Sequence, residues 1–319
     1  MKLFISTLLY STIVFLFFTS YCTFASENSE NLAALYWTSN GFDNRDLTIS
    51  PNGNYLLTSL VSPKYKRRFI LMSKKTDGRW QPLKLAPFSG TYNDFEPMFS
   101  GDGSQLWFSS DRPRYSGDQR KDWDLWYMNV TYNSDSLSFT KPVNPGSPVN
   151  TEEDEYYPSV AANGNLYFTA TRKAGPGKED IYVAQRNGDM YQTVVPLGKG
   201  VNSTTYEFNA YVAPDESYLI FSSFQRADDL GRGDLYISFR NTKGIYEEAI
   251  SLGDKINSSA LDYCPFVFEG RLYFSSDRYF DPGNYERTSE LEQWLTSPGN
   301  GLGDIYSIPF HPEKQLSAK

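Results

Sequence analysis

The sequence predicts an all-β protein, a single β-propeller of five four-stranded blades, with six blades as the alternative. One strand-rich unit recurs five times, and the turn residues of the copies lie 50, 61, 52 and 54 positions apart: Gly53, Gly103, Gly164, Glu216 and Gly270. A period of this size, with strands in every unit, is typical of an array of small sheets. One four-stranded sheet leaves both faces uncovered, and stacking such sheets around an axis buries them.

The clearest copy reads DFEPMFSGDGSQLWFSSDR from Asp94 and continues with DLWYM from Asp124. Its Asp-Gly pair lies between two apolar runs and predicts a tight hairpin, because Gly tolerates a positive φ. DLWYM predicts a third strand. Further copies begin at positions 155, 207 and 262, and a degenerate copy begins at position 44. Weaker apolar runs at residues 80–85, 191–197 and 246–252 predict a fourth strand in these units.

The first 25 residues have the pattern of a secretory signal peptide. One lysine is followed by an apolar run of roughly 15 residues and by Thr23-Phe24-Ala25, so we expect cleavage after Ala25. A transmembrane anchor would need nearer to 20 apolar residues. Cys22 raises a lipoprotein alternative, but Tyr21 is too bulky for the residue that normally precedes a lipidated cysteine. We therefore expect residues 26–319 to form the propeller domain of a periplasmic or secreted protein, with no membrane span after processing.

The ends of the domain are expected to meet. The last copy stops at its third strand, Ile305 to Ile308, whereas residues 32–37 lie where a fourth strand would precede the first copy. We predict that this N-terminal strand completes the last blade and removes its open edge. Two inserts, residues 113–123 and 279–303, interrupt the second and fifth copies, and propeller inserts that serve function rise from loops on one face.

Charge and cysteine content exclude some classes of function. The net charge of −8 becomes −9 without Lys2, which disfavours nucleic acid and anionic membranes as partners. Cys264 is the one cysteine of the processed chain, so no internal disulfide is expected. Glu152-Glu153-Asp154-Glu155 offers oxygen ligands for a structural calcium, but the spacing matches no EF-hand loop.

These units resemble the WD40-like repeats of the TolB-type propeller family. The resemblance rests on Pro97-x-Phe-Ser-x-Asp-Gly, on Leu106-x-Phe-Ser-Ser-Asp-Arg and on Gly303-Asp-Ile-Tyr, and it covers nearly all of residues 44–308. It implies a periplasmic scaffold that binds partner proteins in or near the central channel. Related propellers include peptidase-associated domains and pectate-fragment lyases. The lyases are expected to hold a metal with histidines, and this chain has only His311, which argues against that activity.

The candidate binding residues repeat with the blades. Carboxylates precede the innermost strand in four of the five copies, and arginines follow the second strand: Asp94, Glu155, Glu207 and Asp262, with Arg112, Arg172 and Arg278, and with Gln225-Arg226 in the fourth copy. Rotational symmetry predicts that they meet at one channel mouth. Two interpretations stay open: structural ion pairs that fix each loop, or a ring that binds a cation, a basic peptide end, sugar hydroxyls or a ligand carboxylate.

From these observations we expect a non-catalytic exported scaffold, a monomer without a cofactor, that docks an envelope protein or a glycan at the channel-mouth face. No nucleophile motif is present, and no catalytic residue or metal ligand is assigned. The alternative is a carbohydrate-active hydrolase or lyase that uses central carboxylates, because acid–base chemistry without histidine needs paired carboxyl groups. That alternative rests on the analogy with five-bladed propellers that host glycosidases with three central acids.

Overall fold

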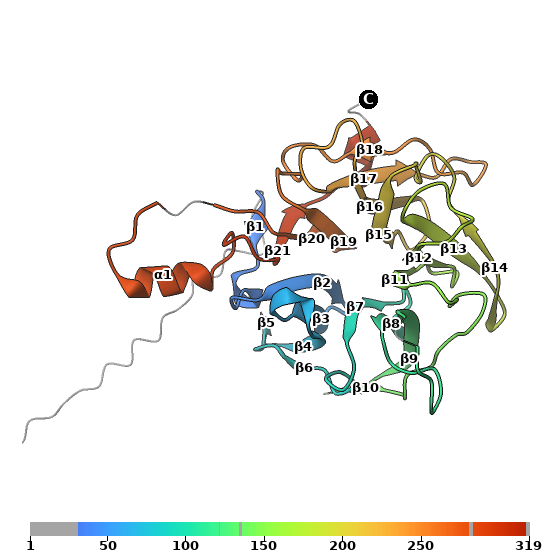
Figure 1. Cartoon of the computed structure of the whole chain (residues 1–319), viewed down its shortest axis with the longest axis horizontal. Helices are drawn as coiled ribbons and strands as arrows, with labels where there is room; N and C mark the ends of the chain where they lie inside the picture. The colour runs from blue at the N-terminus through green and yellow to red at the C-terminus, as the bar shows by residue number, and fades with distance from the viewer. Residues whose placement is uncertain (1–30, 121, 134–135, 281–282, 317–319) are drawn as a thin grey trace, which may run out of the picture.

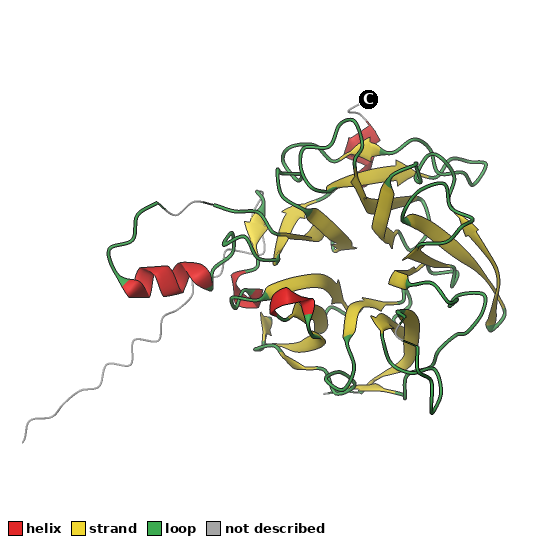
Figure 2. Cartoon of the chain, viewed as in Figure 1, coloured by secondary structure: helices red, strands yellow, loops and turns green. Residues whose placement is uncertain are grey.

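The computed structural model describes residues 31–120, 122–133, 136–280 and 283–316. Within these residues five sheets stand around one axis (Figures 1 and 2), which confirms the prediction of an all-β propeller with five blades. The expected signal peptide, residues 1–25, lies outside the described residues. The part of the chain that is described contains no helix long and apolar enough to cross a membrane.

Each blade is an antiparallel meander that runs outward from the axis. The strands are, blade by blade, β2 (Asp43–Ile49), β3 (Tyr55–Val61), β4 (Arg68–Thr76), β5 (Arg79–Trp80) and β6 (Lys84–Leu85); β7 (Asp94–Phe99), β8 (Gln105–Ser110), β9 (Asp124–Tyr132) and β10 (Leu137–Phe139); β11 (Glu155–Val160), β12 (Leu166–Ala170), β13 (Asp180–Asn187) and β14 (Met190–Pro196); β15 (Tyr206–Val212), β16 (Tyr218–Phe224), β17 (Asp234–Phe239) and β18 (Ile250–Ser251); and β19 (Asp262–Phe268), β20 (Arg271–Ser276), β21 (Asp304–Pro309) and β1 (Ala33–Ala34).

The hairpins between the first two strands explain why the turn residues recur. Gly53, Gly103, Gly164 and Gly270 have φ values between 71° and 86°, and Glu216 adopts the same left-handed conformation with φ 59°. Glycine reaches this region without a steric penalty. The turns therefore fix the register of each innermost strand, and the innermost strands of neighbouring blades contact one another around the whole ring, β19 against β2 included.

The N-terminal strand closes the ring, as predicted. Ala33 and Ala34 pair with Ser307 and Tyr306 of β21, and the Leu35 N–H donates to the Ile305 carbonyl at 2.8 Å. Figure 1 shows β1, the first described strand, lying beside the red β21. A short 3₁₀ turn, Tyr36–Thr38, then leads toward the first blade. The two ends of the described chain are thus held in one sheet.

Removing the closing strand should destabilise the whole ring. Deletion of residues 26–38 exposes the edge of β21 and removes apolar side chains that pack on two cores, among them Leu32, Leu35 and Trp37. We expect the melting temperature to fall by about 5 to 15 °C, as a loss of several kcal/mol would produce in a domain of this size. Deletion of residues 26–30 alone is the control, and an unchanged melting curve in the longer deletion would contradict the closure.

The core consists of apolar layers between adjacent blades. Trp107 and Leu125 of the second blade, for example, pack with Phe168 and Tyr182 of the third. The insert of residues 279–303 contains α1 (Thr288–Leu295), which projects from the edge of the ring in Figure 1. The described chain ends with the short helix α2 (Pro312–Gln315). Five apolar clusters of this kind occur among the described residues, and one of them includes Tyr157 and Cys264 of the innermost strands.

Candidate active site

Each innermost strand contains a β-bulge at the same position. The pairing of all five shifts in register after the second or third residue, as between Phe95 and Met98 of β7. One non-glycine residue in each bulge is left-handed, with φ between 47° and 60°: Asp46, Glu96, Tyr157, Asn209 and Cys264. Non-glycine residues rarely adopt this conformation, and bulges often reorient a side chain next to an active site. We call these five residues the axial ring.

Contacts between non-adjacent blades place these side chains at the axis. The Asn209 amide of the fourth blade lies 3.4 Å from the Glu96 carboxylate of the second. The Tyr157 hydroxyl of the third blade donates to the Pro265 carbonyl of the fifth at 3.0 Å. Tyr157 is 1% exposed, so its ring fills the axis. The axial ring is consequently a closed polar layer and no open pore.

Glu96 is the most densely contacted carboxylate of the axial ring. It accepts hydrogen bonds from the Ser109 hydroxyl and the Tyr157 N–H, both at 2.8 Å, and lies 3.2 Å from the Arg45 guanidinium. Burial raises the pKa of Glu96 to about 7, and the nearby Asp46 carboxylate acts in the same direction. Arg45 and the two hydrogen bonds lower the pKa but do not offset burial. Glu96 can therefore hold a proton near neutral pH.

Arg45 links the two acidic residues of the axial ring. Its guanidinium lies 2.8 Å from Asp46 and 3.4 Å from the Cys264 sulfur, and the Cys264 thiol donates to Asp46 at 2.7 Å. Burial holds the pKa of this thiol well above its ordinary value. The cation keeps the Asp46 and Glu96 carboxyl groups close together without two uncompensated negative charges.

The stability of the protein should fall as the buried Glu96 carboxyl ionises. The folded state binds this proton more tightly than the unfolded state, so the contribution is present below pH 4.5 and lost as pH rises through about 7. The raised pKa corresponds to roughly 3 kcal/mol. We expect Glu96→Gln to remove that part of the decline when urea unfolding is compared at pH 4.5 and 7.5. Equal declines in both proteins would contradict the proton on Glu96.

A cavity of about 280 Å³ lies on one side of the axial ring and exposes Glu96. The residues that directly precede the axial ring in all five blades line its wall: Arg45, Phe95, Tyr156, Phe208 and Tyr263. Trp123, the last residue of the insert of residues 113–123, adds a ring that lies 4.8 Å from the Phe95 ring, edge to face. We call this cavity the axial pocket. Aromatic faces beside buried polar groups are typical of small-molecule and sugar sites.

A second carboxylate, Glu179, lines the axial pocket from the loop before β13. Burial, reinforced by the negative charge of Asp154, raises the pKa of Glu179. Its side chain makes no hydrogen bond or ion pair within the described residues, whereas Asp154 accepts from the Tyr156 hydroxyl at 2.9 Å. The pocket thus combines Glu96, enclosed and strongly hydrogen-bonded, with Glu179, which is available to a ligand.

The carboxylates predicted for the channel mouth lie instead inside the blades. All four are fully buried and form ion pairs: Asp94 with Arg112 at 2.5 Å, Glu155 with Arg172 at 2.6 Å, Glu207 with Arg226 at 3.1 Å and Asp262 with Arg278 at 2.6 Å. Each guanidinium also lies about 5 Å from the centre of an aromatic ring, as Arg278 does over Tyr306 at 4.7 Å. The expected ring at the mouth is therefore corrected to four separate pairs. Their role in ligand binding stays a prediction.

The axial ring residues lie two positions after the residues singled out from the sequence. The bulge turns Glu96 toward the axis while Asp94 points into its own blade beside Ser110, whose hydroxyl donates to it at 2.7 Å. One signal was available in the sequence. Positions 46, 96, 157, 209 and 264 change from acid to tyrosine, amide and thiol, whereas the positions two residues earlier repeat.

The calcium prediction at residues 152–155 also remains untested. In the structure Glu155 belongs to an ion pair, and Asp154 accepts the Trp123 N–H at 2.8 Å. Within the described residues, no group of three or more histidine, cysteine, aspartate or glutamate side chains is placed to hold a metal ion.

Comparison with known proteins identifies relatives in structure only. No family model and no curated protein matches the sequence. Among solved structures, the α-L-arabinofuranosidase PaAbf62A of Podospora anserina, in complex with cellotriose, has a TM-score of 0.51 at 10% identity, covering 84% of this chain and 90% of that one. The catalytic domain of the Coprinopsis cinerea GH62 α-L-arabinofuranosidase has 0.50 at 8%, with 83% and 90% covered. The protein BT0996, in an RGII complex, has 0.52 at 9%, with 85% and 88% covered.

At this identity the similarity establishes the fold, a five-bladed propeller. Two of these three neighbours are named as arabinofuranosidases, and this finding corrects the expectation of a non-catalytic scaffold in favour of its alternative, a carbohydrate-active enzyme. Nothing in the comparisons identifies the TolB-type family, so that resemblance stays a prediction. The structure adds one observation on the same side: the acids of the axial ring, Asp46 and Glu96, depart from the repeat, whereas the predicted binding carboxylates follow it.

Proposed function

We propose that this protein is a glycoside hydrolase whose active site is the axial pocket. The observation that supports the proposal most strongly is Glu96, a buried carboxyl group with a pKa of about 7 that faces a cavity lined by aromatic rings. A carboxyl group that keeps its proton near neutral pH can act as a general acid. The fold shared with two arabinofuranosidases supports the same activity.

The two carboxyl groups of the axial pocket take different roles. Glu96 donates its proton to the glycosidic oxygen of the leaving group. Glu179, whose side chain keeps no hydrogen bond within the described residues, acts as the second carboxylate, either activating water or attacking the anomeric carbon. Asp46 does not line the pocket; its negative charge raises the pKa of Glu96 and so positions the proton. Three acids thereby contribute, with two of them facing the substrate.

The walls of the axial pocket suit a sugar ring. Trp123 and Tyr156 are partly exposed at the mouth and offer flat faces for stacking. The Arg68 guanidinium lies 4.8 Å from the Trp123 ring centre and makes no ion pair within the described residues, so its N–H groups are available for sugar hydroxyls. We further propose a glycan outside the cytoplasm as the substrate, in keeping with the predicted export and the predicted monomer.

Turnover of defined glycans tests the proposal. A panel of neutral and acidic polysaccharides, with aryl arabinosides and aryl galactosides, should yield new reducing ends with the wild-type protein. Glu248→Gln, which changes an exposed carboxylate in the loop between β17 and β18, is the matched control and should retain full activity. Absence of new reducing ends across the panel would count against a hydrolase, and unsaturated products would indicate elimination instead.

A further inference from the structure

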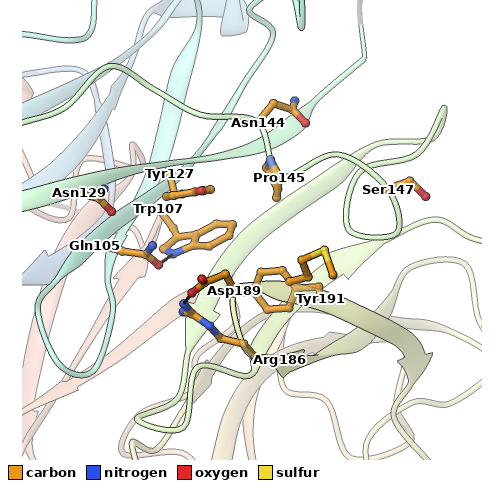
Figure 3. A pocket seen from close by; sticks show the side chains of 11 residues that line it. Gln105, Trp107, Tyr127, Asn129, Asn144, Pro145, Ser147, Arg186, Asp189 and Tyr191 are labelled. Carbon is orange, nitrogen blue, oxygen red and sulfur yellow. Dashed lines mark hydrogen bonds and ion pairs between the residues drawn. The ribbon is translucent and has the colours of Figure 1, made fainter.

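A second cavity lies between the second and third blades, away from the axial pocket. It has a volume of about 460 Å³, and side chains from β8, β9, β13 and β14 line it (Figure 3). We call it the interblade groove. None of its lining residues belongs to the axial pocket or to the four buried ion pairs. The groove is therefore independent of the proposed catalytic groups.

Aromatic rings form one wall of the interblade groove. Trp107 and Tyr127 stack with ring centres 4.9 Å apart, and Tyr191 approaches the Trp107 ring edge-on at 6.0 Å. Figure 3 shows the Tyr127 ring next to the Trp107 indole, and the two ring planes are inclined by 28°. The Trp107 indole N–H donates to the Gln105 side-chain carbonyl at 3.0 Å. This bond uses the oxygen of the Gln105 amide and leaves its NH₂ group able to donate to a ligand. The Tyr127 hydroxyl has no hydrogen-bond partner within the described residues.

The interface between the third and fourth blades shows what the groove lacks. There Glu216, in the β15–β16 turn, accepts from the Asn165 amide at 2.8 Å and from the Tyr167 hydroxyl at 2.9 Å. It also forms an ion pair with Arg240 at 2.5 Å, and Tyr246 closes the network by donating to the Glu216 carbonyl. One buried carboxylate thus accepts from an amide, a hydroxyl and a guanidinium at this interface.

The interblade groove repeats that arrangement without the carboxylate. By position in the blades, Gln105 corresponds to Asn165, Trp107 to Tyr167, Arg186 to Arg240 and Tyr191 to Tyr246. The residue that corresponds to Glu216 is Gly164, which has no side chain.

Arg186 has no buried carboxylate as a partner: its Nε–H donates to the Gly188 carbonyl at 2.9 Å, and its remaining N–H groups face only one exposed acid within the described residues. Its nearest acid is Asp189 at 3.7 Å, whose side chain is fully exposed on the β13–β14 turn. Exposed pairs of this kind contribute little free energy. The stem of Arg186 lies over the glycine turn, where a Cβ on Gly164 would come within 2.4 Å of its Cδ. The groove therefore offers a guanidinium, an amide donor and aromatic faces, with space between them.

We propose that the interblade groove binds a carboxylate-bearing sugar, a uronate residue of a glycan. The uronate carboxylate takes the place that Glu216 occupies at the next interface, between Arg186 and the Gln105 amide, and the sugar ring lies against Tyr127 and Tyr191. The carboxylate follows from the missing side chain at position 164; the choice of a sugar rests on the proposed function. Charge-assisted bonds from arginine to carboxylate supply the affinity, and the aromatic faces orient the ring.

Calorimetric titration with α-1,4-trigalacturonate tests the proposal, with a neutral galactose trisaccharide as the comparison ligand. The Glu96→Gln protein is used throughout, so that the probe is not consumed. We expect trigalacturonate to bind and Arg186→Gln to weaken that binding at least about tenfold. Asp189→Asn should strengthen it by about two- to fivefold, because the competing carboxylate is removed. Arg79→Gln, an exposed arginine on β5, is the control and should leave the affinity unchanged.

The proposal would be overturned if trigalacturonate did not bind, or if the neutral trisaccharide bound equally well. An affinity that stays within twofold in Arg186→Gln would also overturn it, and so would weaker binding in Asp189→Asn. The experiments distinguish failure of the groove proposal from failure of the proposed hydrolase activity. Binding that depends on Arg186 in a protein that turns over no glycan leaves the groove assignment standing, whereas turnover without such binding leaves the axial pocket standing.

Discussion

Replacing Glu96 by Gln is expected to lower kcat/KM on natural glycosides by about 100- to 10,000-fold, the usual contribution of a general acid. The amide preserves the shape of the side chain but cannot give a proton to the leaving oxygen. A substrate with a good leaving group, such as a nitrophenyl glycoside, needs little proton donation and should lose much less. Glu179→Gln should lower the rates on both kinds of substrate, because the second carboxylate is needed whatever the leaving group.

Initial rates on one polysaccharide and one nitrophenyl glycoside measure this difference, with Glu248→Gln as the matched control. The wild-type rate should fall as pH rises above about 7, where Glu96 loses its proton, and this alkaline decline should be absent in Glu96→Gln. Equal losses on both substrates would show that Glu96 serves the structure of the axial ring and does not donate the proton.

Breaking one of the buried ion pairs is expected to cost about 3 to 5 kcal/mol of the free energy of unfolding. Arg278→Met tests this expectation most directly. It removes the partner of Asp262 at 2.6 Å and the donor to the Ile256 carbonyl at 2.9 Å, while keeping an apolar stem over the Tyr306 ring. Asp262 then remains fully buried, and its charge is left to the hydrogen bonds from Ser258.

Urea unfolding of the single variants and of Arg278→Met with Asp262→Asn completes the test. The double variant should recover part of the loss, because no buried charge is left unpaired. Arg79→Gln controls for the loss of a surface arginine. A change below about 1 kcal/mol in Arg278→Met would contradict a structural role and return the pair to the candidate ligand-binding residues.

The repeat and the turn chemistry were enough to predict the blades. Asn-Gly and Asp-Gly turns mark the first hairpin of the blade in three copies, and the left-handed Glu216 shows that the fourth turn keeps the geometry without glycine. The closing strand followed from counting strands, since the fifth copy ends one strand short. Its length did not follow, because β1 pairs over only Ala33–Ala34 before the chain turns.

The residues of the axial pocket were harder to predict from the sequence than the blades were, and the reason is a local feature of the backbone. Asp94 and Glu96 belong to the same strand, and regular alternation would place both side chains on the same face. The bulge between Phe95 and Met98 breaks that alternation and gives Glu96 a left-handed backbone conformation. No residue type at these positions predicts such a bulge. Glu179 was missed because it enters the axial pocket from a loop of another blade, a contact that only the closed ring creates.

The repeat also led to the wrong emphasis on residues that most blades share. Carboxylates that recur in four blades, such as Asp94 and Asp262, suggested a symmetric binding ring, whereas in the structure they form separate buried ion pairs. Positions that lie at the axis and differ in chemistry, such as Glu96 and Asn209, line the axial pocket. We therefore place the proposed active site where the innermost strands depart from the repeat.

The most direct test of the account is a crystal structure of the Glu96→Gln protein with an oligosaccharide that the wild-type protein hydrolyses. The sugar should occupy the axial pocket against Trp123 and Tyr156, with its glycosidic oxygen within hydrogen-bond distance of residue 96 and with Glu179 facing the anomeric carbon. An oligosaccharide bound elsewhere, with the axial pocket empty, would contradict the assignment of Glu96 as the acid.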